Sequence, residues 1–308
     1  MATLRTVTLN TGFDDYFTVG EIAWGGVAPM HAFHSVCSGK GISCARTAGA
    51  LGLPAVAYAL VGEADVEVFG ARLSDEGITH RLVGVPGSTR HNLTLVDGTG
   101  QRVAAHFVAQ GFHLTADDVT PLVDAVLADI EPGDVVTLNG STATGLPDDT
   151  WAGLAEAAIE RGARVIVDAQ KAAFIAALRV PGVFAFKPND DEILPLPGVA
   201  DSAAPVSTAL RLLRDAGARL PLVSLGADGV AFLDGDVERR ATCPVDNAVV
   251  SVMAGDAFVA GMAQGLLAGA EPVDCLRHGL AAAAAHVEGL SGSALRSRAV
   301  ENLARLQL

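Results

Sequence analysis

The stretch Ser251-Val252-Met253-Ala254-Gly255-Asp256-Ala257-Phe258 decides the fold, because a polar turn leads there into an apolar helical pattern. A helix that begins here directs free N–H groups at an incoming anion, which such a helix end favours by roughly 0.3–1 kcal/mol. Ala254 and Gly255 are small enough to admit a phosphoryl oxygen, and Asp256 lies beside them as a proton acceptor. The segment therefore suits phosphoryl transfer, although an acidic helix start is the simpler interpretation of these residues taken alone.

A second glycine-containing turn precedes a helical pattern near the other end of the chain. Ser38-Gly39-Lys40-Gly41-Ile42-Ser43-Cys44-Ala45 leads into apolar positions at Ala48 and Leu51. Two small-residue turns at helix starts, each with a polar group to offer, can face one cleft.

Composition limits the class of protein. With 308 residues and 50% hydrophobic content, the chain can bury one large core. It has no apolar run of roughly 18 residues and no signal-peptide pattern, so we expect no membrane span and a cytoplasmic location. The formal charge of −14 argues against a nucleic-acid partner. The cysteines form no C-x-x-C pair and have no histidine at metal spacing, so we predict buried free thiols at Cys37, Cys44, Cys243 and Cys275.

Strand and helix patterns alternate along most of the chain, which predicts a parallel sheet with right-handed connections. The predicted strands are 4–9, 55–61, 134–139, 164–168, 183–187 and 221–225. The predicted helices are 41–52, 66–73, 115–129, 147–161, 205–216, 255–268, 273–288 and 295–305.

Two segments interrupt this alternation. Between 89 and 108, apolar residues alternate with polar ones on both sides of a turn at Asp97-Gly98-Thr99-Gly100, which predicts a β-hairpin. The stretch from 17 to 33 is also extended. We pair the two as a small β lid, formed by about 12–36 and 88–110, inserted in a single domain that spans 1–308. The lid is a candidate surface for a homodimer, and a second hairpin is predicted across 230–242.

Four motifs follow one another along the chain: Ser38–Ser43, Lys187–Glu192, Ser224–Gly229 and Met253–Asp256. They resemble, in order, the G-G-K-G-x-N, K-P-N-x-x-E, S-L-G-x-x-G and G-A-G-D motifs of the ribokinase-like (PfkB) carbohydrate kinases. Within that family they are similar to hexose-phosphate kinases such as 1-phosphofructokinase and tagatose-6-phosphate kinase. The resemblance covers nearly the whole chain and implies a doubly wound, mostly parallel α/β sheet flanked by helices, with a small β-sheet lid.

The resemblance implies ATP and Mg²⁺ as cofactors, and a hydroxyl of a sugar or sugar phosphate, such as fructose 1-phosphate or tagatose 6-phosphate, as the phosphoryl acceptor. Asp256 matches the general base, and the amides of Ala254 and Gly255 match the groups that stabilise the transferred phosphoryl group. Asn189 and Glu192, at a predicted helix start, match the pair that organises magnesium through water; the alternative is a helix cap with a solvated glutamate. The resemblance places Lys187, Asn189, Ser224, Gly226, Ala227, Gly229, Ser251 and Met253 on the nucleotide side.

On the acceptor side, Asp14, in a predicted loop, matches an aspartate that binds sugar hydroxyls. Arg90 is the candidate for a phosphate already on the sugar, because arginine holds phosphate bidentately; the alternative is an exposed lid arginine. The resemblance also places Ser38, Gly39, Lys40, Gly41, Ser43 and Asn92 on this side.

The chain departs from the family pattern at Met253 and Ser38, each in place of a glycine, and at Ser43, in place of an asparagine. If position 253 needs a positive φ, a side chain there costs about 1–2 kcal/mol. The stretch 24–30 also lacks the basic residue that hexose-phosphate kinases usually carry. Two alternatives therefore stay open: a kinase of an unphosphorylated sugar or nucleoside, and a weakly active binding or regulatory protein on the kinase scaffold.

Overall fold

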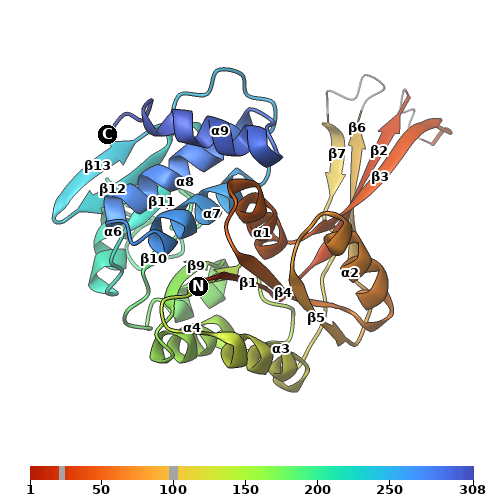
Figure 1. Cartoon of the computed structure of the whole chain (residues 1–308), viewed down its shortest axis with the longest axis horizontal. Coiled ribbons are helices and arrows are strands. Elements are labelled where there is room, and N and C mark those ends of the chain that lie inside the picture. The colour runs from red at the N-terminus through yellow and green to blue at the C-terminus, as the bar shows by residue number, and fades with distance from the viewer. Residues whose placement is uncertain (21–24, 97–102) are drawn as a thin grey trace.

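A parallel sheet forms the centre of the computed structural model, which describes residues 1–20, 25–96 and 103–308 (Figure 1). In the described part of the chain this sheet has six strands in the order β10-β9-β8-β1-β4-β5. Every neighbouring pair is parallel, which confirms the predicted sheet type. The strands are β1 (Leu4–Thr8), β4 (Ala55–Gly62), β5 (His80–Val85), β8 (Val135–Asn139), β9 (Arg164–Asp168) and β10 (Ala185–Phe186).

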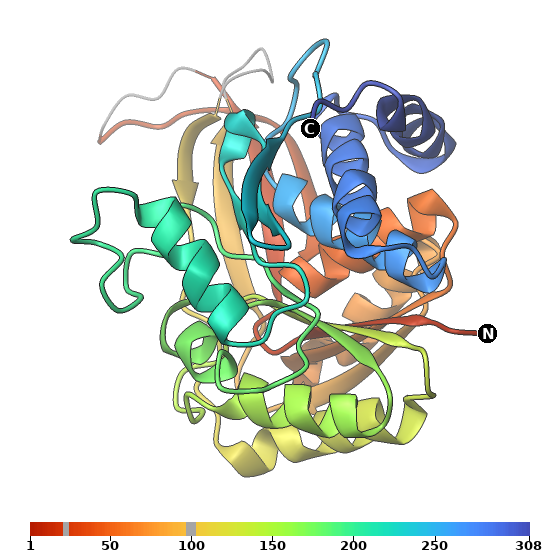
Figure 2. The same ribbon diagram turned by 90° about the vertical axis from the view of Figure 1, so that its left-hand side faces the viewer.

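Helices cover both faces of this sheet (Figures 1 and 2). Successive residues of one strand enter different cores: Val135 packs in the core with α1, α7 and α8, whereas Val136 packs in the core with α3 and α4. This two-sided burial confirms the doubly wound arrangement. The first face carries α1 (Lys40–Leu51), α2 (Val66–Asp75), α7 (Ala254–Leu267), α8 (Pro272–Val287) and α9 (Gly292–Leu303), and the second carries α3 (Ala116–Asp129), α4 (Thr150–Glu160) and α5 (Lys171–Ala177).

A small antiparallel sheet continues the molecule beyond β10. Its strands are β11 (Leu222–Ser224), β12 (Val230–Asp234) and β13 (Val237–Ala241), preceded by α6 (Pro205–Asp215). A parallel bridge between Asn189 and Ser224 connects it to the end of β10. The second predicted hairpin is confirmed, and the strand predicted at 221–225 belongs to this sheet.

The two interrupting segments pair with each other as predicted. They form a separate sheet of β3 (Met30–Ser38), β2 (Gly12–Val19), β6 (Arg90–Val96) and β7 (Val103–Phe107), in that order, which projects from the main body in Figure 1. The central pair, β2 and β6, is parallel and sets Asp14 opposite Asn92. The predicted turn at 97–100 and residue 24 lie outside the described residues.

Several local predictions were wrong. Asp14 lies in strand β2 rather than in a loop, and β5 and α5 were not predicted. The segment after Asn189 is a series of turns instead of a helix start, because Pro195 and Pro197 remove the N–H donors that a helix needs. All four cysteines are free, but Cys243 is only partly covered. No helix among the described residues is long and apolar enough to span a bilayer.

Candidate active site

The residue that precedes α7 has an unusual backbone conformation. Met253 precedes the helix with φ 66°, in the left-handed region, where a non-glycine residue costs about 1–2 kcal/mol. Ala254 is the first helical residue, so the helix begins one residue from the predicted position. Position 253 therefore has the positive φ that was considered above, and its methionine has a strained backbone conformation.

Two lysines and a buried carboxylate lie beside this helix start. The Nζ atoms of Lys40 and Lys187 lie 3.0 and 3.3 Å from Oδ1 of Asp168, the last residue of β9. Gly255 packs against this cluster, since a Cβ atom there would lie 3.3 Å from Lys187 Nζ. The sequence analysis missed Asp168, although a charged residue at the carboxyl end of an otherwise apolar strand of a parallel sheet could have indicated it.

Asp256 is 6% exposed, and its surroundings favour the protonated form. Burial and, next, the negative charge of Asp168 raise the pKa of its carboxyl group, whereas Lys40, Lys187 and the Ser43 hydroxyl lower it, and the net result is a rise from 3.8 to about 7. A carboxylate with a pKa near neutrality is matched to proton transfer at physiological pH. Both its position at the start of α7 and its raised pKa therefore make Asp256 a candidate for the general base.

The charge state of Lys40 follows from the same cluster. Burial lowers the pKa of Lys40, but the charges of Asp168, Glu192 and Asp256 together outweigh burial, so the pKa is raised. Lys40 therefore stays positively charged beside the cleft, where a phosphoryl group can use it.

Two departures from the family motifs contact each other. The Ser43 hydroxyl, on the first turn of α1, donates to the Met253 sulfur over 3.1 Å. The same turn is pressed against β1, because a Cβ atom on Gly41 would come within 2.3 Å of Thr8 Oγ1. The Met253 thioether and the Ser43 hydroxyl are thus in contact where the turn before α1 lies next to the turn before α7.

The acceptor-side residues gather at the base of the lid. Asn92 Nδ2 donates to Asp14 Oδ1 over 2.7 Å. Arg90 is neither free nor an exposed lid arginine: its Nη2 and Nη1 atoms donate to the carbonyls of Asn10 and Ala109 over 3.2 and 3.5 Å. Burial lowers the pKa of Arg90, and its buried Nε atom has no hydrogen-bond partner in the described part of the chain. Arg90 therefore holds the lid to the main body, and its Nε atom is enclosed beside Gly12.

Asn189 and Glu192 hydrogen-bond to each other's backbone. Glu192 N–H donates to Asn189 Oδ1 over 2.7 Å, and Asn189 N–H donates to Glu192 Oε2 over 3.0 Å. Gln170 Nε2 donates to the second oxygen, Glu192 Oε1, over 2.8 Å. The pair caps the turn reciprocally, as the alternative interpretation predicted, but Glu192 is not simply solvated.

Most of the predicted residues line one cleft of about 620 Å³. Among the described residues, Gly41 and Asn92 lie outside its lining, packed against Thr8 and Asp14, and Ala227 lies in an exposed turn next to it. An adjoining cavity of about 630 Å³ shares Lys40 and Arg90 with the cleft. The predicted residues that line the cleft are Asp14, Ser38, Gly39, Lys40, Ser43, Arg90, Lys187, Asn189, Glu192, Ser224, Gly226, Gly229, Ser251, Met253, Ala254, Gly255 and Asp256.

The model of the pfkB family carbohydrate kinases matches residues 17–296. The chain belongs to this family. It is 33% identical to the 1-phosphofructokinase of Xanthomonas campestris pv. campestris, over 94% of this chain and 92% of the relative. It is 28% identical to the 1-phosphofructokinase of Escherichia coli K12, over 86% and 84% of the two chains. The structure superposes on that of Escherichia coli phosphofructokinase-2 in complex with fructose-6-phosphate with a TM-score of 0.87 and 26% identity, over 99% of both chains.

This membership confirms the predicted ribokinase-like fold and the predicted enzyme class. The protein is an ATP-dependent sugar kinase, with a sugar or a sugar phosphate as the acceptor.

Proposed function

We propose that the chain transfers the γ-phosphoryl group of ATP to a hydroxyl of a hexose phosphate, with fructose 1-phosphate as the first candidate and tagatose 6-phosphate as the second. The observation that carries this proposal is the pair of joined cavities. One contains Asp256 and the start of α7, and the other is lined by the cations Arg90 and Lys171. The 1-phosphofructokinase relatives support the first candidate.

In the proposed reaction, the acceptor hydroxyl oxygen attacks the γ-phosphorus and ADP leaves. Asp256 accepts the hydroxyl proton, so the new phosphate ester forms from a developing alkoxide instead of a neutral alcohol. The amides of Ala254 and Gly255, together with Lys40 and Lys187, offset the negative charge on the transferred group. The acceptor hydroxyl groups are held by Asp14, which Asn92 orients.

Arg90 and Lys171 are the proposed ligands of the phosphate that the acceptor already carries. Both line the second cavity, together with Ser141 and the backbone of Gly140. They can replace the basic residue that is missing from 24–30.

Magnesium fits the nucleotide side of the cleft through Glu192. Mg²⁺ keeps several of its waters and is usually held by one or two carboxylates and the substrate phosphates, so it does not need a cage of protein ligands. No such cage of His, Cys, Asp and Glu occurs among the described residues. Glu192 and Asn189, which face the cleft, would hold the hydrated ion, and the ion would neutralise phosphate charge.

The lid offers a surface for a homodimer. Phe33, Val103 and Phe107 on its strands are 52%, 59% and 54% exposed, which is unusual for large apolar side chains on a small sheet. A tetrameric form is recorded for Escherichia coli phosphofructokinase-2, which is 28% identical and superposes with a TM-score of 0.88. Light scattering of the protein and of Phe107→Ser tests this part of the proposal. We also propose a cytoplasmic location, where ATP is plentiful and free thiols such as Cys37 stay reduced.

The alternative function is a kinase of an unphosphorylated sugar or nucleoside, because both Nη atoms of Arg90 already donate to backbone carbonyls. Consumption of ATP against a panel of hexose phosphates, free hexoses and nucleosides separates the two. The proposal expects the hexose phosphates to be preferred, and a preference for a free hexose or nucleoside that Arg90→Ala leaves unchanged would reject it.

A further inference from the structure

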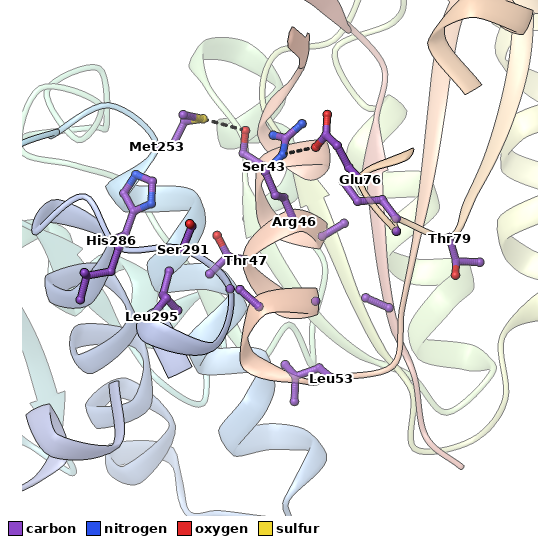
Figure 3. Close-up of a pocket in the computed structure, with 18 of the residues that line it drawn as sticks. Ser43, Arg46, Thr47, Leu53, Glu76, Thr79, Met253, His286, Ser291 and Leu295 are labelled. Carbon is purple, nitrogen blue, oxygen red and sulfur yellow. Dashed lines mark hydrogen bonds and ion pairs between the residues drawn. The ribbon is translucent and has the colours of Figure 1, made fainter. Parts of the chain in front are cut away.

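A hydrogen bond from α8 fixes the peptide next to the strained residue Met253. The Nε2 atom of His286, in the last turn of α8, lies 2.8 Å from the Val252 carbonyl oxygen. A backbone carbonyl only accepts hydrogen bonds, so Nε2 carries the hydrogen and donates it. Figure 3 shows the His286 ring pointing towards the backbone at Met253. The ring therefore holds the Val252–Met253 peptide in one orientation.

The same end of α8 also holds the preceding part of this loop. The N–H groups of Val249 and Val250 donate to the Val287 carbonyl over 2.8 and 3.1 Å. These two bonds attach the loop to α8, but they leave the peptide after Val252 free to rotate. The Val252 side chain is 64% exposed, so its packing does not fix that peptide either. Among the described residues, His286 is the only one that hydrogen-bonds to the Val252 carbonyl.

Rotation of this peptide would relieve the backbone strain. Met253 has a φ of 66°, and turning the Val252–Met253 peptide plane by about 180° would bring this angle into the ordinary negative range. The left-handed conformation is disfavoured by roughly fivefold to thirtyfold for a non-glycine residue. One hydrogen bond favours a conformer by roughly twofold to tenfold. The two effects are similar in size, so the observed orientation depends on the bond from His286.

The orientation of the peptide decides which of its groups faces the phosphoryl site. The C=O and N–H groups of a trans peptide point in opposite directions. Because the Val252 carbonyl points to His286, the Met253 N–H points away from α8. This N–H has no hydrogen-bond partner among the described residues, and Met253 lines the cleft next to Ala254 and Gly255. After rotation, a carbonyl oxygen would replace the N–H group and would repel a phosphoryl oxygen.

We propose that His286 is a positioning residue for phosphoryl transfer: it holds the Met253 N–H as a third amide donor beside those of Ala254 and Gly255. The inference rests on the proposed function of this site and extends it to a residue that does not line the cleft. A glycine at position 253, as in the family motif, adopts a positive φ without strain. The need for His286 therefore follows from the methionine that this chain has there.

The kinetic test uses the full chain and measures single-turnover phosphate transfer, together with KM for ATP and for the acceptor. His286→Phe removes the donor and keeps a ring, whereas His286→Gln keeps an N–H donor. His278→Phe is the matched control on the same helix, because the His278 ring is hydrogen-bonded to Gln264 Oε1 over 3.3 Å and does not line the cleft.

We expect His286→Phe to slow phosphate transfer about threefold to tenfold with KM for the acceptor unchanged, and both His286→Gln and His278→Phe to stay within about twofold of wild type. In a Met253→Gly background, His286→Phe should slow transfer less than about twofold, because glycine does not need the hydrogen bond. No loss in His286→Phe, an equal loss in both backgrounds, or a loss that glutamine does not restore overturns the proposal.

A second measurement does not require turnover. NMR of the protein with isotope-labelled methionine nitrogen follows the Met253 N–H signal, identified by its absence in Met253→Leu. ADP, Mg²⁺ and aluminium fluoride are added as a mimic of the transferred phosphoryl group. We expect this signal to shift in wild type and in His286→Gln, and to shift less in His286→Phe. An unmoved signal in wild type, or an equal shift in His286→Phe, overturns the proposal. A shift that depends on His286 in a protein that phosphorylates no sugar phosphate rejects the proposed function and leaves the positioning role in place.

Discussion

Asp256→Asn is expected to make the protein more stable at the same time as it abolishes most of the activity. Raising the pKa of this buried carboxyl group from 3.8 to about 7 costs the folded state about 4 kcal/mol once the group is ionised. This loss of stability is absent below about pH 4, develops as the pH rises to 7, and is complete above 7. The figure of about 4 kcal/mol already includes the attraction of Lys40 and Lys187 for the carboxylate, and the amide has no charge to bury, so we expect a net gain of up to about 4 kcal/mol at pH 8.

The assay is urea unfolding of Asp256→Asn and wild type at pH 4 and pH 8, with the exposed Asp190→Asn as the control. The same variant should lower turnover at least a hundredfold, since general-base contributions are about 10²–10⁴, and kcat/KM of wild type should rise with pH through an inflection near 7. The reasoning is refuted if the stability difference is the same at both pH values, or if the variant turns over at nearly the wild-type rate.

Three further variants test the rest of the site. Asp168→Asn removes the negative charge that raises the pKa of Asp256, so the inflection in the pH profile of kcat/KM should move to lower pH; an unmoved inflection contradicts the assigned coupling. Arg90→Ala should raise KM for the sugar phosphate about tenfold or more while changing KM for ATP little, because a charge-assisted contact contributes about 1.5–3 kcal/mol; equal effects on both substrates argue against phosphate binding. Met253→Gly should speed single-turnover phosphate transfer about threefold to thirtyfold by relieving the φ of 66°, and an unchanged or slower rate means that methionine is an accepted part of the site.

The sequence was sufficient for features that depend on local patterns. The buried strands of the parallel sheet appear as apolar runs, and the two glycine turns appear next to the helices that they start. The lid was predictable because the segment that forms β6 and β7 alternates in polarity, and because this segment and the extended stretch from 17 to 33 both interrupt the alternation of strands and helices. Their pairing then follows from the need of each half-apolar strand for a neighbour.

Contacts between distant residues were not predictable, even where a local signal could have indicated one of the partners. Asp168 lies 128 positions from Lys40, and no pattern along the chain records that β9 places it next to both lysines. The contacts of Arg90 with the carbonyls of Asn10 and Ala109 depend on how the lid meets the main sheet. Every residue has a backbone carbonyl, so the sequence does not indicate which carbonyls accept these hydrogen bonds.

Met253 and Ser43 show what such contacts change in the interpretation. Considered separately, each position lacks a residue that the family motifs have. Met253 replaces a glycine that suits a left-handed backbone, and Ser43 replaces an asparagine whose amide can reach a ligand. The structure joins them, because the Ser43 hydroxyl donates to the Met253 sulfur over 3.1 Å, 210 positions apart in the chain. Residues in contact do not contribute additively to stability or rate. Restoring glycine at 253 alone relieves backbone strain but removes the sulfur to which the Ser43 hydroxyl donates. The effect of either residue on rate or stability can therefore be interpreted only when the residue at the other position is known.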